Sequence, residues 1–345
     1  MEFKIPDEMQ IVDGICQLNC EIFDYNDVRS FLITNTLDKK VVDRFISWLV
    51  ALRIIPQSRR HWGPHLYKMV TQYYERVNHY FKKNPEDPLL TIPLNAENAI
   101  RPDIESSLPW FNKICKEVGL SDGKISNAKL RISRIYSLVV HETTNFSYAQ
   151  GLQVYGMVFL MISSSFSVHA KLSIDFAEAV SFYLTRAIVQ LVPALRMLDN
   201  KQKFVNHVSS IDQIILNTSP ENFTYLQQHG SGSFAFCLQY EISLFALQHS
   251  ALAVMSIWDQ IFGRMSQISE IIQCFTAAHV MQVKFKEGIN DIGDYMVKYS
   301  QWDYMKLVDD AVRMLQHRRS CKEEFCLYFC PKLQKYHGYE ARNDF

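Results

Sequence analysis

The sequence predicts an all-α protein, on three observations. Apolar residues recur at spacings of three and four along most of the chain, which is the period of one face of a helix. No stretch sustains the alternation of apolar and polar residues that marks a half-buried strand. Glycine and proline are scarce, with 12 and 11 residues in a chain of 345, as expected where long helices dominate. A chain of this length that is 48% hydrophobic can bury one large core or two lobes.

The apolar pattern places the helices in order along the chain. The first 49 residues carry apolar side chains at helical spacing, so we expect them to pack as leading helices on the module that follows. Further helices are expected over residues 130–140, 152–162, 173–191, 204–216, 234–247, 251–262, 268–285 and 304–315. The stretch 152–162 is the most apolar, but its 11 residues fall short of the ~20 that cross a bilayer. We expect it to be a buried helix, and we expect the main polar breaks at 82–98 and 217–222.

Charge and the two ends of the chain indicate the kind of partner. Lys and Arg number 36 and Asp and Glu also number 36, so no net field attracts nucleic acid or an anionic membrane surface. The N-terminal residues lack the basic and apolar pattern of a signal peptide, and neither end carries a lipidation motif. We therefore expect a cytoplasmic protein with protein partners, no nucleic-acid partner and no direct membrane insertion.

Cysteine usage and motif searches give no sign of a metal or a cofactor. The eight cysteines are scattered, and a cytosolic chain keeps its thiols reduced. Cys321, Cys326 and Cys330, with His337 after them, match no common zinc spacing, and small apolar filling is the better interpretation. The sequence contains no phosphate-binding glycine loop with Lys-Ser/Thr, no Gly-x-Ser-x-Gly and no His-Glu-x-x-His. We expect no metal and no cofactor.

Five short stretches occur in a definite order between about residues 50 and 285. They are Arg53-Ile54-Ile55-Pro56-Gln57-Ser58-Arg59-Arg60-His61-Trp62; Ile100-x-x-Asp103-x-x-Ser106-Ser107 with Pro109-Trp110-Phe111; Tyr148-Ala149-Gln150-Gly151-Leu152; Leu244-Phe245; and Ile257-Trp258-Asp259-x-x-Phe262. In this order they resemble a divergent TBC domain, the all-helical module of Rab GTPase-activating proteins. The resemblance implies a two-lobed helical TBC domain over residues 50–285. It leaves residues 1–49 as an N-terminal helical extension and residues 286–345 as C-terminal helices and tail of the second lobe.

The resemblance also implies a mechanism. A small GTPase alone positions its attacking water poorly and lacks a cation for the charge that grows on the transferring phosphoryl group. In TBC domains the arginine of an Ile-x-x-Asp-x-x-Arg-Thr motif supplies the charge, and the glutamine of a Tyr-x-Gln-Gly-Met motif orients the water. An arginine supplied in trans is worth about 10³ to 10⁵ in rate. GTP and Mg²⁺ would belong to the partner GTPase.

On these motifs, Gln150 keeps the catalytic glutamine and Ser106 stands at the position of the arginine finger. A serine hydroxyl is short and neutral, so it neither reaches a partner's phosphates nor opposes their charge as a guanidinium does. The resemblance also implies binding roles for four residues of the matching motifs: Asp103, Tyr148, Gly151 and Arg60. Catalysis is expected to be impaired or absent.

No other arginine is expected to replace the finger. Arg101 lies five residues before Ser106, which on a helix is about 140° round the axis and ~7.5 Å along it, so it should point away. Arg59, Arg60, Arg131 and Arg134 could approach in the fold, but Arg60 is needed for the entry motif and nothing in the sequence aims the others at the site. Read singly, Gln150 is an ordinary polar residue and Asp103 an N-cap; the order of the motifs favours the functional interpretation.

Two departures from the family pattern bear on function. The family's Arg-Trp pair before Leu-Phe is Gln239-Tyr240 here, and the spacing in Arg60-His61-Trp62 is short. Our leading hypothesis is a TBC-domain protein that binds a Rab-type GTPase or a protein complex in membrane traffic, a pseudo-GAP held at endomembranes through its partner. The alternatives are an active Rab GTPase-activating protein that uses Gln150 with a cation from elsewhere, and a helical scaffold subunit of a complex.

Overall fold

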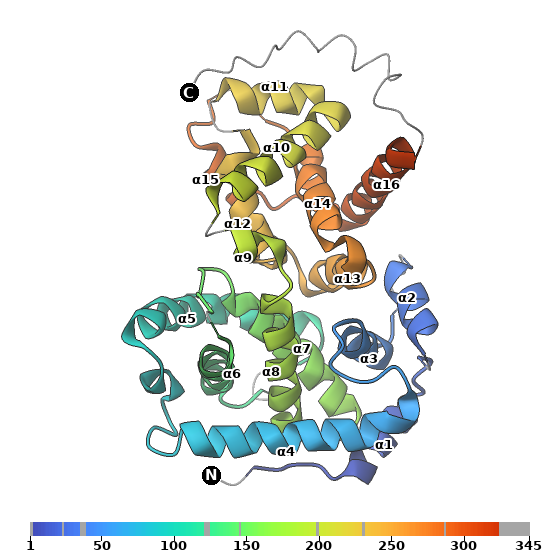
Figure 1. Cartoon of the computed structure of the whole chain (residues 1–345), viewed down its shortest axis with the longest axis vertical. Coiled ribbons are helices and arrows are strands. Elements are labelled where there is room, and N and C mark those ends of the chain that lie inside the picture. The colour runs from blue at the N-terminus through green and yellow to red at the C-terminus, as the bar shows by residue number, and fades with distance from the viewer. Residues whose placement is uncertain are drawn as a thin grey trace.

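The described part of the chain is built of helices alone (Figure 1). The structure is a computed structural model and describes residues 3–22, 24–34, 39–120, 125–144, 146–197, 200–229, 232–285 and 288–323. Those ranges contain 16 α-helices, five short 3-10 helices and no strand, which confirms the all-α prediction. None of the described helices combines the length and the apolar character needed to cross a bilayer.

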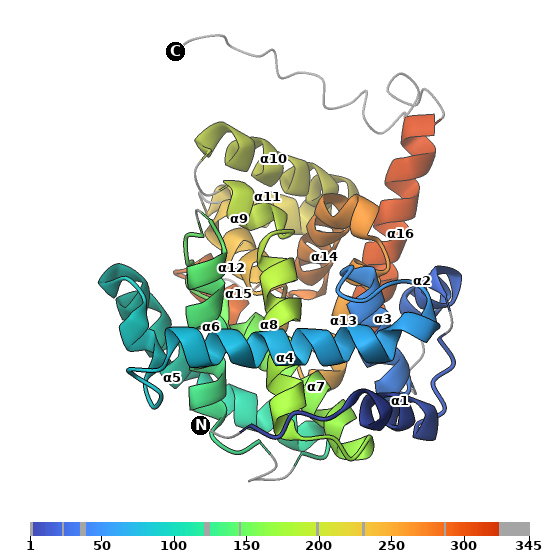
Figure 2. The ribbon, with the colours of Figure 1, turned by 60° about the horizontal axis from the view of Figure 1, so that its bottom comes forward.

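The first lobe holds the N-terminal half of the chain. Its elements are α1 (Glu8–Gln17), α2 (Tyr25–Ile33), α3 (Val41–Ala51), η1 (Arg59–His61), α4 (Trp62–Tyr80), η2 (Pro88–Thr91), α5 (Leu94–Glu117), α6 (Ala128–Glu142), α7 (Gln153–His169) and α8 (Ile174–Val189). Helix α7 packs against α3, α5, α6 and α8, and α4 runs across α6 and α8 (Figure 2). The N-terminal helices join this lobe, since α1 packs on α4 and α3 packs on α7.

The second lobe holds the remaining helices. Its elements are α9 (Pro193–Met197), α10 (Lys201–Thr218), α11 (Pro220–Gln228), η3 (Gly232–Ala235), α12 (Cys237–Ile242), η4 (Ala246–Gln248), α13 (Ala251–Phe262), η5 (Met265–Gln267), α14 (Ile268–Gln282), α15 (Ile292–Lys298) and α16 (Tyr304–Glu323). Helix α14 packs against α10, α12 and α16. Helix α13 lies between the lobes, because it contacts α2, α3 and α5 on one side and α14 and α16 on the other (Figure 1).

Helix α7 is the buried axis of the first lobe. Its sequence contains no Asp, Glu, Lys or Arg, and every side chain from Gln153 to Ser167 is buried. A helix that is apolar all round is stable only when other helices cover all of its faces. This explains why the most apolar stretch of the sequence became a core helix.

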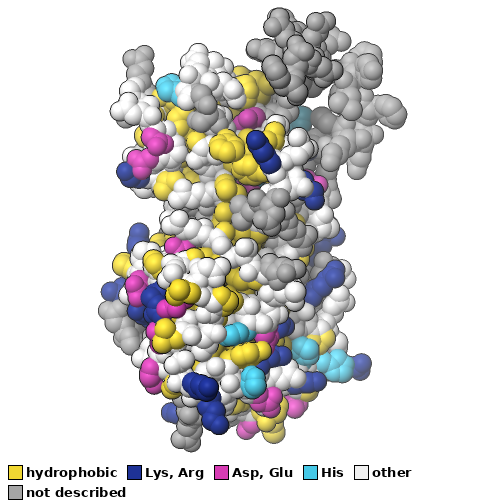
Figure 3. All heavy atoms as spheres, turned by 60° about the vertical axis from the view of Figure 1, so that its left-hand side comes forward, with side chains coloured by type: hydrophobic (Ala, Val, Ile, Leu, Met, Phe, Trp, Pro, Cys, Tyr) yellow, Lys and Arg dark blue, Asp and Glu magenta, His cyan; other side chains and the backbone are white. Residues whose placement is uncertain are grey.

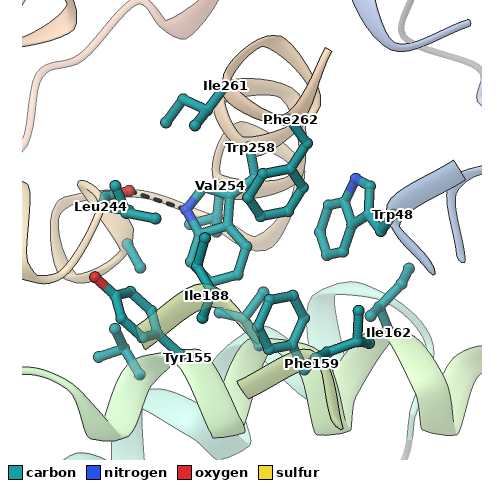
Figure 4. Close-up of a cluster of buried hydrophobic side chains, with 14 of the residues drawn as sticks. Trp48, Tyr155, Phe159, Ile162, Ile188, Leu244, Val254, Trp258, Ile261 and Phe262 are labelled. Atoms are coloured by element: carbon teal, nitrogen blue, oxygen red, sulfur yellow. Dashed lines mark hydrogen bonds between the residues drawn. The ribbon is translucent and has the colours of Figure 1, made fainter. Parts of the chain in front are cut away.

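An aromatic cluster joins the two lobes (Figure 4). The ring of Trp258 on α13 lies 5.7 Å from that of Trp48 on α3 and 5.2 Å from that of Phe159 on α7, measured between centroids. All three side chains are fully buried. The indole N–H of Trp258 donates to the carbonyl of Leu244 at 2.9 Å, so the polar edge of this ring is satisfied inside the core.

A single buried carboxylate next to this cluster ties the N-terminal helices to α13. Asp259 accepts hydrogen bonds from Trp48 Nε1 at 2.8 Å, from Arg44 Nε at 3.1 Å and from Lys39 Nζ at 3.0 Å. The Asp259 side chain is fully buried, and those of Lys39 and Arg44 are nearly so. A buried charge persists only when such partners surround it, so α3 and α13 are held in one relative position.

The segment 234–247 differs from its prediction as one helix. The structure divides it into η3, the short helix α12 and η4, with Leu244 and Phe245 at φ of +44° and +64°. Left-handed backbone is uncommon for such side chains. Both are fully buried here, and the Leu244 carbonyl accepts from Trp258, so tertiary packing overrides the local helical period.

Candidate functional site

Ser106 lies near the middle of α5, on its exposed side. Its hydroxyl donates to the carbonyl of Asp103, one turn back, at 3.2 Å. Two prolines lie on the same face, Pro102 four residues before it and Pro109 three residues after it, and both are exposed. Proline interrupts the hydrogen bonds of a helix, yet α5 continues through both positions. The side chain at position 106 therefore lies on the exposed face of α5, opposite the side that packs on α6 and α7.

The Tyr148–Leu152 segment, which we call the glutamine loop, leads into α7. Gln150 is exposed, and the next residue, Gly151, is buried with φ of +102°. An L-residue rarely adopts this conformation, so glycine is required for the turn. A Cβ added at Gly151 would also lie 3.4 Å from a methyl group of Ile242 on α12. The loop thus lies against the second lobe and holds the Gln150 side chain outward.

The carboxylate of Asp103 joins the glutamine loop to α5. One of its oxygens, Oδ2, accepts from the Tyr148 hydroxyl at 2.9 Å and from the Gly151 amide at 3.2 Å. Asp103 is buried, one turn before Ser106. The structure therefore brings together three of the predicted site residues, Asp103, Tyr148 and Gly151. It also sets Gln150 and Ser106 on the exposed side of this contact.

Tyr148 is held as a neutral donor. Its hydroxyl also lies 3.0 Å from Oε1 of Gln153. Burial, with the neighbouring Tyr136 and the negative charge of Asp103, raises the pKa of Tyr148 far above its usual range. The phenol keeps its proton at any physiological pH, and the carboxylate of Asp103 is the stronger of its two acceptors.

Two further residues complete the contact and were missed by sequence reasoning. Gln153 at the start of α7 donates from Nε2 to the hydroxyl of Ser107 at 2.9 Å, and both side chains are buried. Ser107 is four residues after Asp103, so the two lie on one face of α5. The spacing of Asp103 and Ser107 could have shown from the sequence that Ser107 belongs to the site. No sequence signal pointed to Gln153, because its partner Ser107 is far away in the sequence.

Tyr136 supports the glutamine loop from α6. Its hydroxyl donates to the carbonyl of Leu152 and accepts from the amide of Gly156 at 3.1 Å. The ring packs edge-on against Tyr148 with centroids 6.0 Å apart. A Cβ at Gly156 would lie 2.8 Å from the ring of Tyr136, so glycine permits this close approach. Helices α5, α6 and α7 together fix the backbone on which Gln150 stands.

Arg101 is engaged away from Ser106. Its guanidinium forms ion pairs with Asp87 Oδ2 at 2.9 Å and with Glu97 Oε1 at 2.7 Å. These acidic partners precede Arg101 in the sequence, on the N-terminal side of α5. The expectation that Arg101 points away from the finger position agrees with these contacts.

Arg131 and Arg134 are structural. Both are buried on α6, and both bind Glu178 of α8, from which Arg134 Nε lies 2.6 Å away; Arg131 also pairs with Asp175 at 2.8 Å. Burial, the largest single effect, lowers the pKa of Arg134, but the hydrogen bond to Glu178 and the charge of Glu178 act together against it, and the pKa is raised overall. Neither guanidinium is available to a partner protein.

Arg60 and its neighbours lie in η1 and at the start of α4. Arg60 is exposed in η1 and contacts the ring of His61 at 2.9 Å, and Arg59 donates to the carbonyl of Cys20 at 3.1 Å. Trp62 is buried and donates to the carbonyl of Pro56 at 2.8 Å. No described contact links Arg60 to Asp103 or to the glutamine loop, so its predicted binding role gains no support from the site.

Unlike Arg60 and Trp62, an arginine and a tryptophan of α3 share a hydrogen-bond partner. Arg44 and Trp48, four residues apart on α3, both bind Asp259 of the Ile257-Trp258-Asp259 stretch. Their spacing places them on one face of a helix, which was visible in the sequence. Their shared partner, more than two hundred positions away, was not.

The surface around the site has no single sign of charge. Figure 3 shows the side of the molecule on which α5 lies, where Lys and Arg side chains are interspersed with Asp and Glu.

Within the described ranges, no three His, Cys, Asp or Glu side chains gather as a metal site requires. Cys326, Cys330 and His337 lie outside the described residues.

Comparison with known proteins identifies the family. The family model for the Rab-GTPase-TBC domain matches residues 44–288. The chain belongs to this family. The match starts six residues before and ends three residues after the range 50–285 predicted for the TBC domain, and it includes Arg44 and Trp48.

A solved structure supports the same fold for this TBC domain. The crystal structure of the Ypt/Rab-GAP domain of Gyp1p is similar, with a TM-score of 0.60 and 13% sequence identity. The alignment covers 89% of this chain and 99% of that one. At this identity the likeness concerns the fold alone. A search of curated protein sequences found no match.

Proposed function

We propose that this TBC domain binds a Rab-type GTPase through the exposed face of α5 and the glutamine loop, and that its stimulation of GTP hydrolysis is weak. The proposed role is regulation of membrane traffic, with any attachment to endomembranes supplied by the partner. The observation that carries the proposal is the exposed Ser106, set beside an anchored glutamine loop.

The loss of the arginine is quantitatively important. An arginine finger contributes about 10³ to 10⁵ in rate, which corresponds to about 4 to 7 kcal/mol of transition-state stabilisation. The Ser106 hydroxyl carries no charge and is already bonded to the Asp103 carbonyl. Arg101, Arg131 and Arg134 bind carboxylates of the same chain. None of them stands in for the finger.

The glutamine side of the mechanism is intact. Gln150 is exposed, and the backbone on each side of it is held by Tyr148 and Gly151 through Asp103. A primary amide both donates and accepts hydrogen bonds, so Gln150 can contact a water and a backbone group of the partner together. This favours residual GAP activity over a purely structural role as a scaffold.

Single-turnover GTP hydrolysis across a panel of Rab proteins tests the proposal. Wild type, Ser106→Arg and Gln150→Ala are compared, and binding of each to the GTP-loaded Rabs is measured separately. We expect binding to at least one Rab, weak stimulation by wild type and a large increase for Ser106→Arg. We expect Gln150→Ala to lose the stimulation and keep the binding.

Two results would contradict the proposal. Stimulation by wild type as strong as that of an intact GAP would show that Ser106 is no handicap. Absence of binding to every Rab would instead favour the scaffold alternative, in which the same fold serves another protein complex.

A further inference from the structure

We propose that Lys129 supplies part of the positive charge that Ser106 does not, and that the weak stimulation depends on it. This inference rests on the proposed function, because it assigns a cation to the same site. The observation behind it is an ion pair between Lys129 of α6 and Glu105 of α5, with 2.6 Å between Nζ and Oε1. Glu105 is the residue immediately before Ser106.

Lys129 is accessible beside the finger position. The side chains of Lys129 and Glu105 are each 49% exposed, so neither belongs to the core. Glu105 and Ser106 both lie on the exposed part of α5, about 100° apart round its axis. The ammonium group thus flanks Ser106, and the flexible four-carbon stem of lysine allows it to move toward a negative group placed over the helix.

The face of α6 that carries Lys129 also supports the glutamine loop. Lys129 and Tyr136 are seven residues apart, which is two helical turns, so they lie on one face about 10.5 Å apart along the axis. Tyr136 binds the Leu152 carbonyl and packs on Tyr148. Lys129 and the contacts that hold the glutamine loop therefore lie along one face of α6.

The helix itself gives no reason for a lysine at this position. Lys129 lies in the first turn of α6, where a positive charge opposes the helix dipole. The pair with Glu105 offsets this, and the lysine in turn lowers the pKa of Glu105. Exposed ion pairs contribute little to stability, so exchanging the Glu105 carboxylate for a more highly charged phosphate has a low cost.

In GTP hydrolysis, the Lys129 ammonium group would stabilise negative charge that develops on the phosphate oxygens. A water oxygen bonds to the γ-phosphorus of the partner's GTP, and the bond from that phosphorus to the β–γ bridging oxygen breaks. The products are GDP³⁻ and H₂PO₄⁻, which carries both protons of the water. Lys129 forms no covalent bond; its ammonium group donates hydrogen bonds to oxygens on which negative charge grows. Lysine lacks the planar fork of arginine, so the stimulation stays well below that of an intact finger.

The test compares Lys129→Ala, Lys129→Arg and Glu105→Gln with wild type in the same hydrolysis and binding assays. We expect Lys129→Ala to lower the stimulated part of the rate about tenfold, less than the 10²- to 10³-fold lost with a preorganised oxyanion donor. Lys129→Arg should keep or raise the rate. Glu105→Gln should raise it, because the ammonium loses its competing partner. A merely structural role predicts the opposite for Glu105→Gln, since that change breaks the pair.

Two controls test whether the effect is specific to Lys129. Lys298→Ala removes a similar exposed pair, Lys298 with Asp294 at 2.7 Å, on α15 of the second lobe, and should change nothing. In a Ser106→Arg background, Lys129→Ala should have a smaller effect, because the arginine now supplies the charge.

The outcomes separate this inference from the proposed function. Two results with a Rab that binds would overturn the role of Lys129 and leave the binding proposal standing. In the first, wild type does not accelerate hydrolysis of the GTP bound to that Rab. In the second, wild type and Lys129→Ala accelerate it equally. Absence of binding to all Rabs would overturn both.

Discussion

Replacing Asp103 by asparagine tests whether this carboxylate holds the glutamine loop on α5. In the wild type, Oδ2 of Asp103 accepts from the Tyr148 hydroxyl at 2.9 Å and from the Gly151 amide at 3.2 Å. The asparagine side chain has the same shape, and its carbonyl oxygen can take the place of Oδ2. The change therefore removes the charge and leaves the geometry.

The expected magnitude follows from these two bonds. A hydrogen bond to a charged group contributes about 1.5–3 kcal/mol and a neutral one about 0.5–1.5 kcal/mol, so each bond weakens by about 1 kcal/mol. We expect Asp103→Asn to lower the free energy of unfolding by about 2 kcal/mol. Asp103→Ala also leaves the Gly151 amide without a partner, while the Tyr148 hydroxyl keeps Oε1 of Gln153, and should cost about 3 kcal/mol.

Urea unfolding followed by tryptophan fluorescence measures the change, with Ser106→Ala as the matched control. Ser106 is exposed on the same helix, so its replacement should stay within about 0.5 kcal/mol of wild type. Hydrogen exchange of the peptide that contains Gly151 gives a local readout and should speed up in Asp103→Asn. If Asp103→Asn matched Ser106→Ala in both measurements, the carboxylate would not be what joins the loop to α5.

Three further predictions concern the loop, the lobe junction and pH. Gly151→Ala forces an L-residue to φ of +102° and should cost about 1–3 kcal/mol while abolishing the stimulation gained by Ser106→Arg. Asp259→Ala leaves Lys39 and Arg44 buried without their carboxylate and should cost about 3–5 kcal/mol in urea unfolding. His249 and His279 are buried with 2.8 Å between their Nε2 atoms, and burial lowers the pKa of His279 to about 3 and that of His249 well below its usual range. Both pKa values are lower in the folded state than the unfolded value of about 6.5, so stability should fall as pH drops below that value; the contribution of His279 alone is about 2 kcal/mol at pH 5.

Each of these predictions has a contrary result. Unchanged stimulation in the Gly151→Ala variant of Ser106→Arg would show that the loop tolerates another backbone. A cost below about 1 kcal/mol for Asp259→Ala would mean that the junction repacks without its ion pairs. For the histidines, His279→Gln should reduce the loss between pH 7 and pH 5; an equal loss in variant and wild type would assign the pH dependence to other groups.

Several helices were predictable from sequence because local signals agree with the packing. The helix expected at 251–262 forms at those residues, since Ser250 caps its first turn and Gly263 follows its last residue. The apolar stretch 152–162 likewise forms the core of α7. The segment 234–247 does not follow its period, because Trp258 and the buried rings around it hold Leu244 and Phe245 in left-handed backbone.

The candidate site was predictable in its members and not in its geometry. Motif order pointed to Asp103, Tyr148, Gln150 and Gly151, and the structure joins three of them through one carboxylate oxygen. The hydrogen bond from Gln153 to Ser107 was not predicted, because a bond between residues 46 positions apart leaves no local sequence pattern. Arg44, Trp48 and Asp259 were missed as a unit for the same reason.

The sequence by itself determined that this protein is helical, that it resembles a TBC domain and that a serine stands where an arginine finger is expected. Periodicity, composition and motif order are properties of neighbouring residues, so they can be read without coordinates. Only the tertiary structure decided which cations are bound elsewhere and which one pairs with Glu105, the residue before Ser106. Those pairings join distant segments, and burial and distance, which determine whether a charge is available to a partner, exist only once the chain has folded.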